Sequence, residues 1–491
     1  MKHKDYVYLC ASLIAGFIIT CLIVSKYFTA DADMVNSAIA WTEINKHGLS
    51  VMLGWKPTID NWYLAIYPVH FLIFFVFGGP SVFILKAIAV SQSILCGLIS
   101  SLIARKITGN PESFLLIVFF AGMSFFAYNL GYVDHIFSHN SVNLYGLLCI
   151  LIYLYRRDSI YATVVICLLS LLAAVSDPWY VVAYLLPFMI HSVYMKATGG
   201  HTGRNGWAQM ALLAFTMGVF FSNIIQRWLL VPVAGFKLAS FDVILSNINW
   251  YFHDHGRMIN LFFVENDYLY IASSLIFVAS ALLIALRKAN RYINVLLALS
   301  VLGVSSSFVL GEPVKMEYSA RFLANLLYLI PLILIINSSG RERQIVSAAL
   351  ALSLSSSAWS HALHVENPRD KITLEMISFM EANNLNYGYG AYWAARANEL
   401  TWRSGGEVTI RPYVTNRTTG QIEWRGKHSQ AFDTWYAPYK GKAFIAITTD
   451  RETCPIVSVC LEGIKKQYGE PDETLKFKQF TFYVYNDFEK P

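Results

Sequence analysis

Long apolar runs separated by short polar segments dominate the first 360 residues of the chain. An α-helix needs about 17 to 25 predominantly apolar residues to cross the hydrocarbon core of a bilayer, and these runs have that length. We therefore predict an α-helical polytopic membrane protein with about eleven transmembrane helices. The predicted spans are residues 6–28, 81–104, 113–132, 140–155, 161–176, 179–195, 207–231, 267–286, 292–310, 321–337 and 344–361.

Basic residues in the short loops between these runs predict the orientation, because Lys and Arg are enriched in cytoplasmic loops. With a cytoplasmic N-terminus, all the basic loops fall on the inner side, and the odd number of crossings places the C-terminal part outside. The expected location is the bacterial inner (plasma) membrane, with a periplasmic C-terminal domain. The first run follows Lys2 and Lys4 but lacks a clear cleavage site, so we expect a retained anchor. The basic loops lie at residues 105–106, 156–157, 196–204, 287–291 and 341–343.

Two segments depart from this simple pattern. Trp62 to Phe77 is apolar but short and contains Pro68, so we expect it to lie along the membrane interface or to re-enter the bilayer. Ser176-Asp177-Pro178-Trp179 forms a tight turn between two predicted spans, which could instead be one kinked hairpin.

From about residue 362 the chain becomes more charged and the apolar runs shorten. We predict a transmembrane domain over residues 1–361 and a periplasmic α/β domain over residues 362–491. Segments 29–80 and 233–266 are expected to be long outer loops. The predicted helices of the α/β domain are residues 370–383 and 460–468, and its predicted strands are 387–392, 407–414, 442–448 and 476–485.

Composition supports the membrane class. Hydrophobic residues make up 55% of the 491 residues and charged residues only 14%, whereas soluble domains carry about a quarter charged residues. The net charge of +6 is scattered among short loops, so no nucleic-acid partner is expected. Five cysteines lie in apolar runs, where small core residues are the ordinary interpretation. Cys454 and Cys460 lie close together in the polar domain, where both a disulfide and free thiols are open.

Charged residues gather just after the first apolar run, at the edge of the predicted membrane. Asp31 and Asp33 are followed by Lys56, and Asp134 lies at the outer end of the third run. Carboxylates at a bilayer surface lose hydration, so their presence suggests a purpose. One of these aspartates could act as a general base. Lys56 and Arg321 could bind an anion, and Tyr318 lies one helical turn before Arg321.

Four motifs carry a family resemblance: Asp31-Ala32-Asp33, residues 54–63 with Phe77-Gly78, residues 132–134, and residues 318–322. In the order of these motifs along the sequence, the chain resembles the GT-C superfamily of membrane glycosyltransferases, which use polyprenyl-phosphate-linked sugars. Residues 54–63 are similar to the Lys-Pro-Pro-x-x-x-Trp stretch of lipid A aminoarabinose transferases, with Lys-Pro-Thr here. The superfamily carries an Asp-Glu pair where this chain has Asp31-Ala32-Asp33. Either aspartate could therefore correspond to the first acidic residue of that pair. Protein mannosyltransferases are a similar group of the same superfamily, and topology and length also resemble serotype-converting O-antigen glucosyltransferases.

The resemblance implies transfer of a sugar, with a hexose such as glucose expected, from undecaprenyl phosphate to a periplasmic glycan or lipid. It implies catalytic roles for Asp31, Asp33 and Asp134. Substrate contacts are expected from Lys56, Tyr318, Arg321, Trp62, Tyr63 and His135. The expected partners are the lipid-linked donor, the acceptor, the bilayer, and an upstream sugar-lipid synthase and flippase. No cofactor or tightly bound metal is expected, and a weak divalent-ion dependence stays open.

Ordinary interpretations stand beside these roles. Asp33 could cap the helix that follows, and Lys56 and Arg321 could reach up to lipid headgroups. His135 and His139 are spaced for a metal on a helix, but a polar helix start is the favoured explanation. His253-Asp254-His255 could bind a divalent ion or a sugar, and a solvated loop is the favoured explanation there. The tryptophans of the C-terminal part could bind sugar rings or fill a core.

Other functions also remain open: a lipid A or protein glycosyltransferase, an O-antigen polymerase or ligase, and a lipid-linked sugar flippase. A polymerase would be favoured by Arg-rich outer loops, whereas the outer loops here are more acidic than basic. A flippase would be favoured by internal repeats and by ionisable groups at the bilayer midplane. The chain shows no evident repeat, and its charges gather at one rim.

Overall fold

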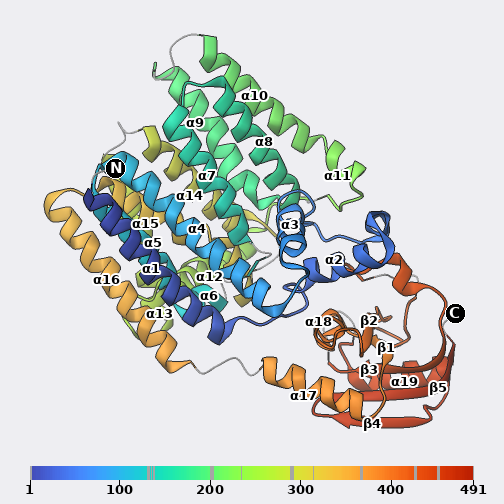
Figure 1. The fold of residues 1–491 in the computed structure, drawn as a ribbon. Helices are drawn as coiled ribbons and strands as arrows, with labels where there is room; N and C mark the ends of the chain where they lie inside the picture. Colours follow the sequence, from blue (N-terminus) through green and yellow to red (C-terminus); the bar gives the residue numbers. More distant parts are fainter. Residues whose placement is uncertain are drawn as a thin grey trace. The chain divides into compact units, whose positions relative to one another are not determined.

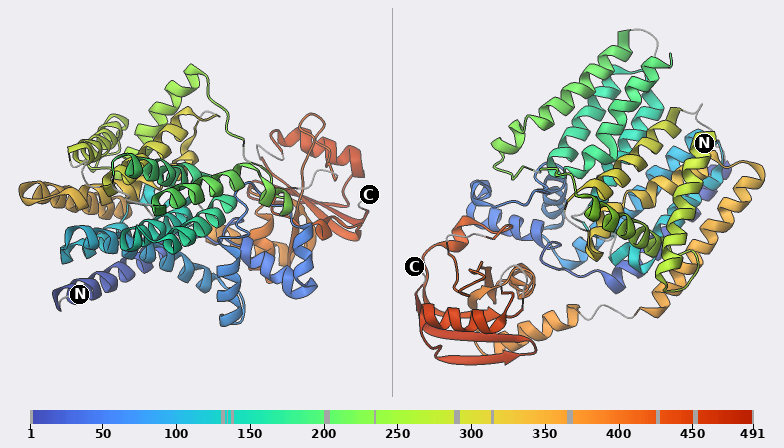
Figure 2. Two further views of the ribbon diagram at one scale, coloured as in Figure 1. Left: turned by 90° about the horizontal axis from the view of Figure 1, so that it is seen from above. Right: turned by 180° about the vertical axis from the view of Figure 1, so that it is seen from behind.

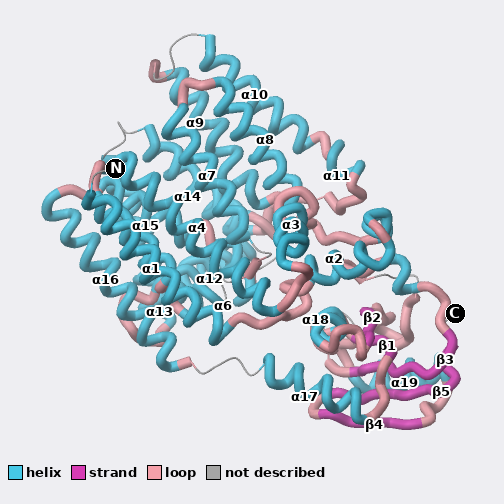
Figure 3. Tube along the Cα trace, viewed as in Figure 1, coloured by secondary structure: helices cyan, strands magenta, loops and turns pink. Residues whose placement is uncertain are grey.

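The computed structural model describes residues 3–129, 133, 135–136, 139–199, 204–233, 235–287, 292–312, 315–364, 369–424, 428–449 and 454–489. Contacts divide the chain into two compact units. The helical unit comprises Met1–Phe28, Ile59–Ile66 and Lys86–Glu366. The mixed unit comprises Thr29–Thr58, Tyr67–Leu85 and Asn367–Pro491. Among the described residues, the strands of the sheet all belong to the mixed unit (Figure 3).

Figure 1 labels the helices of the helical unit, which, apart from α12, lie in or beside the predicted apolar runs. Helix α4 begins in the mixed unit, because its first turn precedes Lys86. The helices are α1 (His3–Tyr27), α4 (Val82–Thr108), α5 (Leu115–Ala121), α6 (Phe125–Asn129), α7 (His139–Arg156), α8 (Ile160–Ser176), α9 (Leu186–Ala197), α10 (Arg204–Phe221), α11 (Ile224–Trp228), α12 (Phe241–Ile259), α13 (Asp267–Arg287), α14 (Tyr292–Leu310), α15 (Leu326–Asn337) and α16 (Gly340–Leu363).

Five described helical segments are long and apolar enough to cross a membrane: α1, α4, α13, α14 and the segment Tyr318–Asn337. Shorter apolar helices of 10–17 residues, among them α8 and the segment Val181–Ala197, accompany them. The protein is therefore a helical protein of the membrane type with a small C-terminal sheet. Eleven full-length spans, however, are not found among the described residues.

Local breaks explain the difference, because they divide predicted spans into shorter helices. The predicted span 113–132 is interrupted at Gly122, between α5 and α6. A π-helical turn (η3, Val181–Leu185) precedes α9, whose second residue is Pro187. Proline donates no backbone hydrogen bond, and such a turn accommodates the loss. Asn223, in the left-handed conformation with φ of 55°, separates α10 from α11.

Helices α7 and α16 lie where the sequence predicts spans, but neither is uniformly apolar. Helix α7 opens with His139, Asn140 and Asn143, and all three side chains are buried inside the protein. Buried polar side chains of this kind require hydrogen-bond partners. The start of α7 therefore faces protein and not lipid.

Close packing joins the helices of this unit. Helix α10 packs against both α8 and α9, and the three helices form one group in both views of Figure 2. Gly146 of α7 contacts the ring of Tyr184, leaving no space for a side chain at residue 146. Gly256 of α12 lies directly against the backbone of Tyr270 in α13. Glycines at these crossings let the elements approach more closely than other residues would.

Most of the predicted outer loop 233–266 is helical, which corrects the sequence-based expectation. Its helix, α12, is strongly amphipathic, with a polar face buried in the helical unit. Phe241, Leu245 and Ile248 follow helical spacing on the exposed face. Such an exposed apolar stripe suits contact with lipid at a membrane interface. The sequence prediction failed because the polar residues of α12 suggested solvent, whereas Asn247, Asp254 and His255 are buried in the protein.

The mixed unit contains a five-stranded sheet with strand order β2-β1-β3-β5-β4. Strand β1 pairs in parallel with β2 and β3, whereas β5 pairs antiparallel with β3 and β4. Apolar residues of α17 pack on one face, and Cys460 and Ile464 of α19 pack on the other. The strands are β1 (Tyr387–Gly390), β2 (Thr409–Pro412), β3 (Lys440–Ile447), β4 (Glu473–Phe477) and β5 (Phe480–Glu489), and the helices are α17 (Arg369–Ala382), α18 (Ala397–Arg403), η5 (Asp433–Tyr436) and α19 (Val457–Tyr468).

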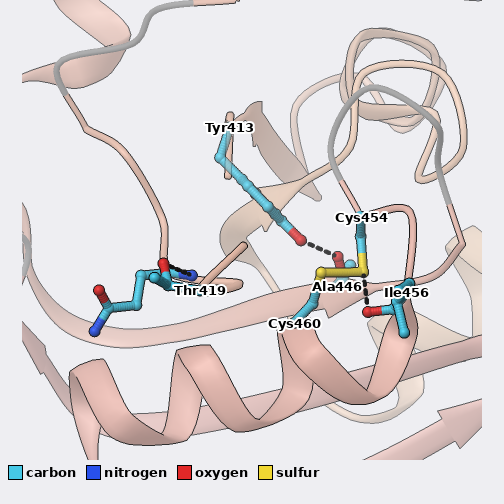
Figure 4. The surroundings of a disulfide bond; sticks show 7 residues. Tyr413, Thr419, Ala446, Cys454, Ile456 and Cys460 are labelled. Carbon is cyan, nitrogen blue, oxygen red and sulfur yellow. Dashed lines mark hydrogen bonds between the residues drawn. A yellow bond between two sulfur atoms is a disulfide. The ribbon is translucent and has the colours of Figure 1, made fainter. Parts of the chain in front are cut away.

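One predicted strand is wrong in this sheet. Residues 476–485 form parts of two strands, β4 and β5, joined by a turn in which Lys478 has a φ of 52°. The sequence left both a disulfide and free thiols open for Cys454 and Cys460, and in the structure the two are bonded beside the first turn of α19 (Figure 4). The sequence-based boundary at residue 361 stays a prediction.

The mixed unit also includes α2 (Asn36–His47), the short helix η1 (Leu49–Gly54) and α3 (Tyr67–Phe77). Helix α3 covers most of the segment predicted to lie at the membrane interface. Its residues Leu72, Phe75 and Phe77 are 63%, 74% and 70% exposed. Large apolar side chains exposed together suit a surface that contacts lipid.

Candidate functional site

Asp31 organises the loop that follows α1. Its Oδ1 accepts hydrogen bonds from the backbone N–H groups of Asp33 and Met34, both at 3.0 Å. This pattern closes a tight turn before α2. Asp31, and not Asp33, thus closes the turn that precedes α2, and Val35, the residue before the helix, makes no side-chain cap.

Asp33 occupies a different environment. Its side chain is partly exposed, and Oδ1 accepts a hydrogen bond from Gln430 Nε2 at 3.0 Å. The Tyr392 hydroxyl lies between Asp33 Oδ1, at 3.2 Å, and Gln430 Oε1, and it can donate to either. Burial raises the pKa of Tyr392 well above its ordinary value, and the charges of Asp33 and Asp31 add to the shift. Tyr392 therefore remains a protonated donor.

Gln430 is itself fixed from a second side. Asn36 donates from Nδ2 to Gln430 Oε1 at 2.7 Å, and Tyr67 donates to Asn36 Oδ1 at 2.5 Å. Both contacts are buried. The amide that holds Asp33 is thus oriented by α2 and α3.

Arg369 balances the negative charge on the other side of the loop. Its guanidinium lies 3.9 Å from Asp31 Oδ2 and 3.0 Å from Glu399 Oε2. Burial acts to lower the pKa of Arg369, but Asp31 and Glu399 outweigh it and the pKa is raised. Glu399 is fully buried and also accepts from the Thr373 hydroxyl at 2.6 Å. A charged arginine thus links the two carboxylates.

Lys56 belongs to the same unit. Its backbone N–H donates to Ala431 O at 3.0 Å, and its carbonyl accepts from the Gln430 N–H at 2.7 Å. Its side chain is exposed. The backbone of this predicted phosphate-binding residue is thereby joined to the residue that holds Asp33.

A second polar cluster lies in the helical unit, around the turn between α8 and η3. His139 Nδ1 lies 2.5 Å from Asp177 Oδ2, and both side chains are buried. Trp179 Nε1 donates to Asn325 Oδ1 at 3.1 Å, and Asn325 donates to Asn143 Oδ1 at 2.7 Å. The predicted tight turn thus connects α7 to the start of α15.

Two predicted substrate residues adjoin this second cluster. Asn61, immediately before Trp62, donates to Val175 O at 2.6 Å. Trp62 is buried with a positive φ of 63°, whereas Tyr63 is half-buried. Arg321 precedes Phe322, whose ring packs 4.4 Å from that of His139.

Other predicted residues lie apart from these contacts. Tyr318 is 51% exposed, and its hydroxyl bonds to Met316 Sδ. The carbonyl of His135 accepts from Gln92 at 3.5 Å. His253 bonds to Asp254 and Asp267 within the helical unit, which corrects the solvated-loop interpretation. Asp134 lies outside the described residues.

Sequence reasoning missed Arg369, Tyr392, Glu399 and Gln430. They lie more than 330 positions after Asp33 in the chain, and no local motif connects them to it. The cluster arises because residues 29–58 and the C-terminal part form one compact unit.

No protein-family model matches this chain, and no curated protein matches it in sequence. The sequence motifs and the geometry of these side chains are therefore the basis for a function.

Proposed function

We propose that this protein is a membrane glycosyltransferase that moves a sugar from a polyprenyl-phosphate carrier to a periplasmic glycan or lipid. The observation that supports it best is Asp33, a partly exposed carboxylate held by Gln430 and Tyr392. Positioned carboxylates serve as general bases when a hydroxyl group must lose its proton. Asp33 also belongs to the Asp31-Ala32-Asp33 motif that resembles the acidic motif of GT-C transferases, although that resemblance fits Asp31 equally.

In the proposed reaction, Asp33 takes the proton from an acceptor hydroxyl. The acceptor oxygen then attacks the anomeric carbon, and the bond from that carbon to the phosphate oxygen breaks. Polyprenyl phosphate leaves with the bonding electrons, and negative charge grows on it. A nearby cation lowers the energy of that charge, and the exposed Lys56 is the candidate in this unit. Arg321, in the helical unit, stays a predicted phosphate ligand.

Asp31 has a positioning role in this scheme. Its Oδ1 holds the turn that presents Asp33, and its other oxygen faces Arg369 at 3.9 Å. The contacts of Arg369 with Asp31 and Glu399 hold the loop in one conformation. Asp33 is therefore our preferred base, with Asp134 as a further predicted catalytic residue.

The disulfide supports the proposed location. Cys454 and Cys460 are bonded, and disulfides persist in oxidising compartments such as the bacterial periplasm. This agrees with the distribution of basic loops, which predicts an outer C-terminal domain. We propose a bacterial inner-membrane protein whose mixed unit faces the periplasm, with O-antigen as the preferred acceptor.

Mass analysis of cell-surface glycans tests the proposal. Cells that express the wild-type protein should carry a hexose-sized addition on the O-chain that cells expressing Asp33→Asn lack, at equal protein levels. An addition on lipid A would change the acceptor to the aminoarabinose-transferase type. Identical glycans and lipid A in both strains, together with no turnover of a polyprenyl-phosphate hexose by the purified protein, would overturn the function.

A further inference from the structure

A cavity of 590 Å³ lies in the mixed unit, apart from the Asp33 contacts. Helix α2 contributes one wall, and the end of α18 with the edge strand β2 contributes another. Ligand sites in proteins commonly measure about 300–1,000 Å³ and combine aromatic walls with a few fixed polar groups. The cavity therefore has the size to accept a short oligosaccharide.

Tryptophans dominate the aromatic lining. Trp41, Trp402 and Trp435 come from three separate elements and all line the cavity. The Arg411 guanidinium stacks on the Trp435 ring at 4.2 Å, which keeps that ring in place. Flat aromatic faces are suited to the C–H faces of sugar rings.

An unused hydrogen-bond donor strengthens this interpretation. Trp435 is 4% exposed, and its indole N–H has no partner among the described residues. Arg411 Nε is also buried and has no hydrogen-bond partner within the described part of the chain. Both residues line the cavity, and buried donors without a partner are rare and costly, so a glycan hydroxyl that reaches them on binding would stabilise the complex.

The charges of the lining are mixed. Glu43 is buried and attracts Arg411, so the carboxylate offsets the guanidinium. Thr42, Asn45 and Thr401 add uncharged polar groups. Lys46 also lines the cavity, so two cations accompany the one carboxylate. The three tryptophans and the uncharged polar groups favour a neutral sugar over a free phosphate, and the lining is too polar for a lipid chain.

We infer that this cavity binds a neutral oligosaccharide, the acceptor of the sugar that is transferred. The inference rests on the proposed function. Helix α2 connects the Asp33 contacts to the cavity. Asn36, which fixes Gln430, lies about 10 Å along this helix from Glu43, which lines the cavity. Glu399 and Trp402 likewise share α18, with Glu399 bonded to Arg369 and Trp402 lining the cavity. An extended glycan held in the cavity would continue toward Asp33.

Isothermal titration of the purified full-length protein with neutral hexose tetrasaccharides tests the inference. Trp402→Ala should weaken binding at least tenfold, because it removes an aromatic wall. Trp435→Phe keeps a ring but removes the N–H group, and one lost hydrogen bond should weaken binding by up to about tenfold. Trp393→Ala is the matched control, since Trp393 is 39% exposed and does not line the cavity.

Unchanged affinity in both cavity variants, with folding verified by thermal denaturation, would overturn the inference. Saturable binding of inorganic phosphate in preference to the tetrasaccharides would also overturn it. If Trp402→Ala fails to fold, the affinity of Trp435→Phe still tests the inference, because this substitution preserves the ring packing.

An assay of donor hydrolysis distinguishes a failure of this inference from a failure of the proposed function. Trp402→Ala should raise the acceptor KM while leaving the slow hydrolysis of a polyprenyl-phosphate hexose unchanged. Asp33→Asn should lose transfer and hydrolysis but bind the tetrasaccharide as the wild type does. Binding that depends on Trp402, with no donor turnover in the wild type, would support the cavity and overturn the enzyme function.

Discussion

Gln430 Nε2 donates to Asp33 Oδ1 at 3.0 Å, although the two residues are 397 positions apart in the sequence. The amide is held by Asn36 on its other side, so its orientation is determined by the fold and not by solvent. A carboxylate fixed in this way can be placed against a substrate with little loss of conformational freedom. This relationship distinguishes Asp33 from Asp31, whose Oδ1 accepts hydrogen bonds from backbone N–H groups.

Substitution of the two aspartates should therefore have unequal effects. Asp33→Asn should reduce kcat by about 100- to 10,000-fold, the range typical of a lost general base. Asp31→Asn should cost about tenfold, because the amide oxygen still accepts both backbone N–H bonds. Transfer kinetics with the purified variants measure both values, and thermal denaturation confirms folding. Full activity of Asp31→Asn, Asp33→Asn and Asp134→Asn would rule out the mechanism.

Gln430→Ala should lower kcat by about tenfold, because Asp33 loses a donor worth about 0.5–1.5 kcal/mol. We expect the donor KM to stay unchanged, since Gln430 positions the base and does not bind the carrier. Gln421→Ala, in the same unit, serves as the control and should behave as the wild type. A rise in donor KM with kcat preserved would contradict the positioning role.

Removal of the disulfide should destabilise the mixed unit without abolishing its fold. The bond closes a short loop of six positions, for which the chain-entropy relation gives about 2 kcal/mol. Cys454→Ser with Cys460→Ser should unfold at a lower temperature, and dithiothreitol should lower the Tm of the wild type but not of the double variant. Maleimide labelling of Cys454 and Cys460 in periplasm-exposed protein, without a reductant, would show that the thiols are free and the prediction wrong.

Stability of the helical unit should depend on His253. The hydrogen bond to Asp254 raises the pKa of His253, against the lowering effect of burial. A raised pKa means that the protonated form is favoured by folding, so this stabilisation is complete below about pH 6.5 and is lost as the pH rises through the folded-state pKa. Thermal denaturation between pH 6 and 9 should show a declining Tm that is flatter in His253→Gln. Equal slopes for both proteins would refute the assignment.

The sequence predicted where most helices lie, because burial in lipid and burial in protein both require apolar residues. It did not predict that several of the eleven expected spans are broken into shorter helices. Helices α1, α4, α13 and α14 coincide with predicted spans to within a few residues. The same reasoning failed for α12, in which Asn247, Asp254 and His255 are buried and an apolar stripe is exposed. Periodicity identifies an amphipathic helix but does not decide which face meets solvent, lipid or protein.

Local sequence also singled out Asp31, Asp33 and the Cys454–Cys460 pair, since charged residues beside a membrane and neighbouring cysteines are recognisable by position alone. It could not reveal that Arg369, Tyr392 and Gln430 surround the aspartates. That arrangement depends on residues 29–58 packing with the C-terminal part, and such long-range pairing leaves no trace in local patterns. The apolar segments were thus determined by short-range hydrophobicity, whereas the partners of Asp33 were decided only by tertiary packing.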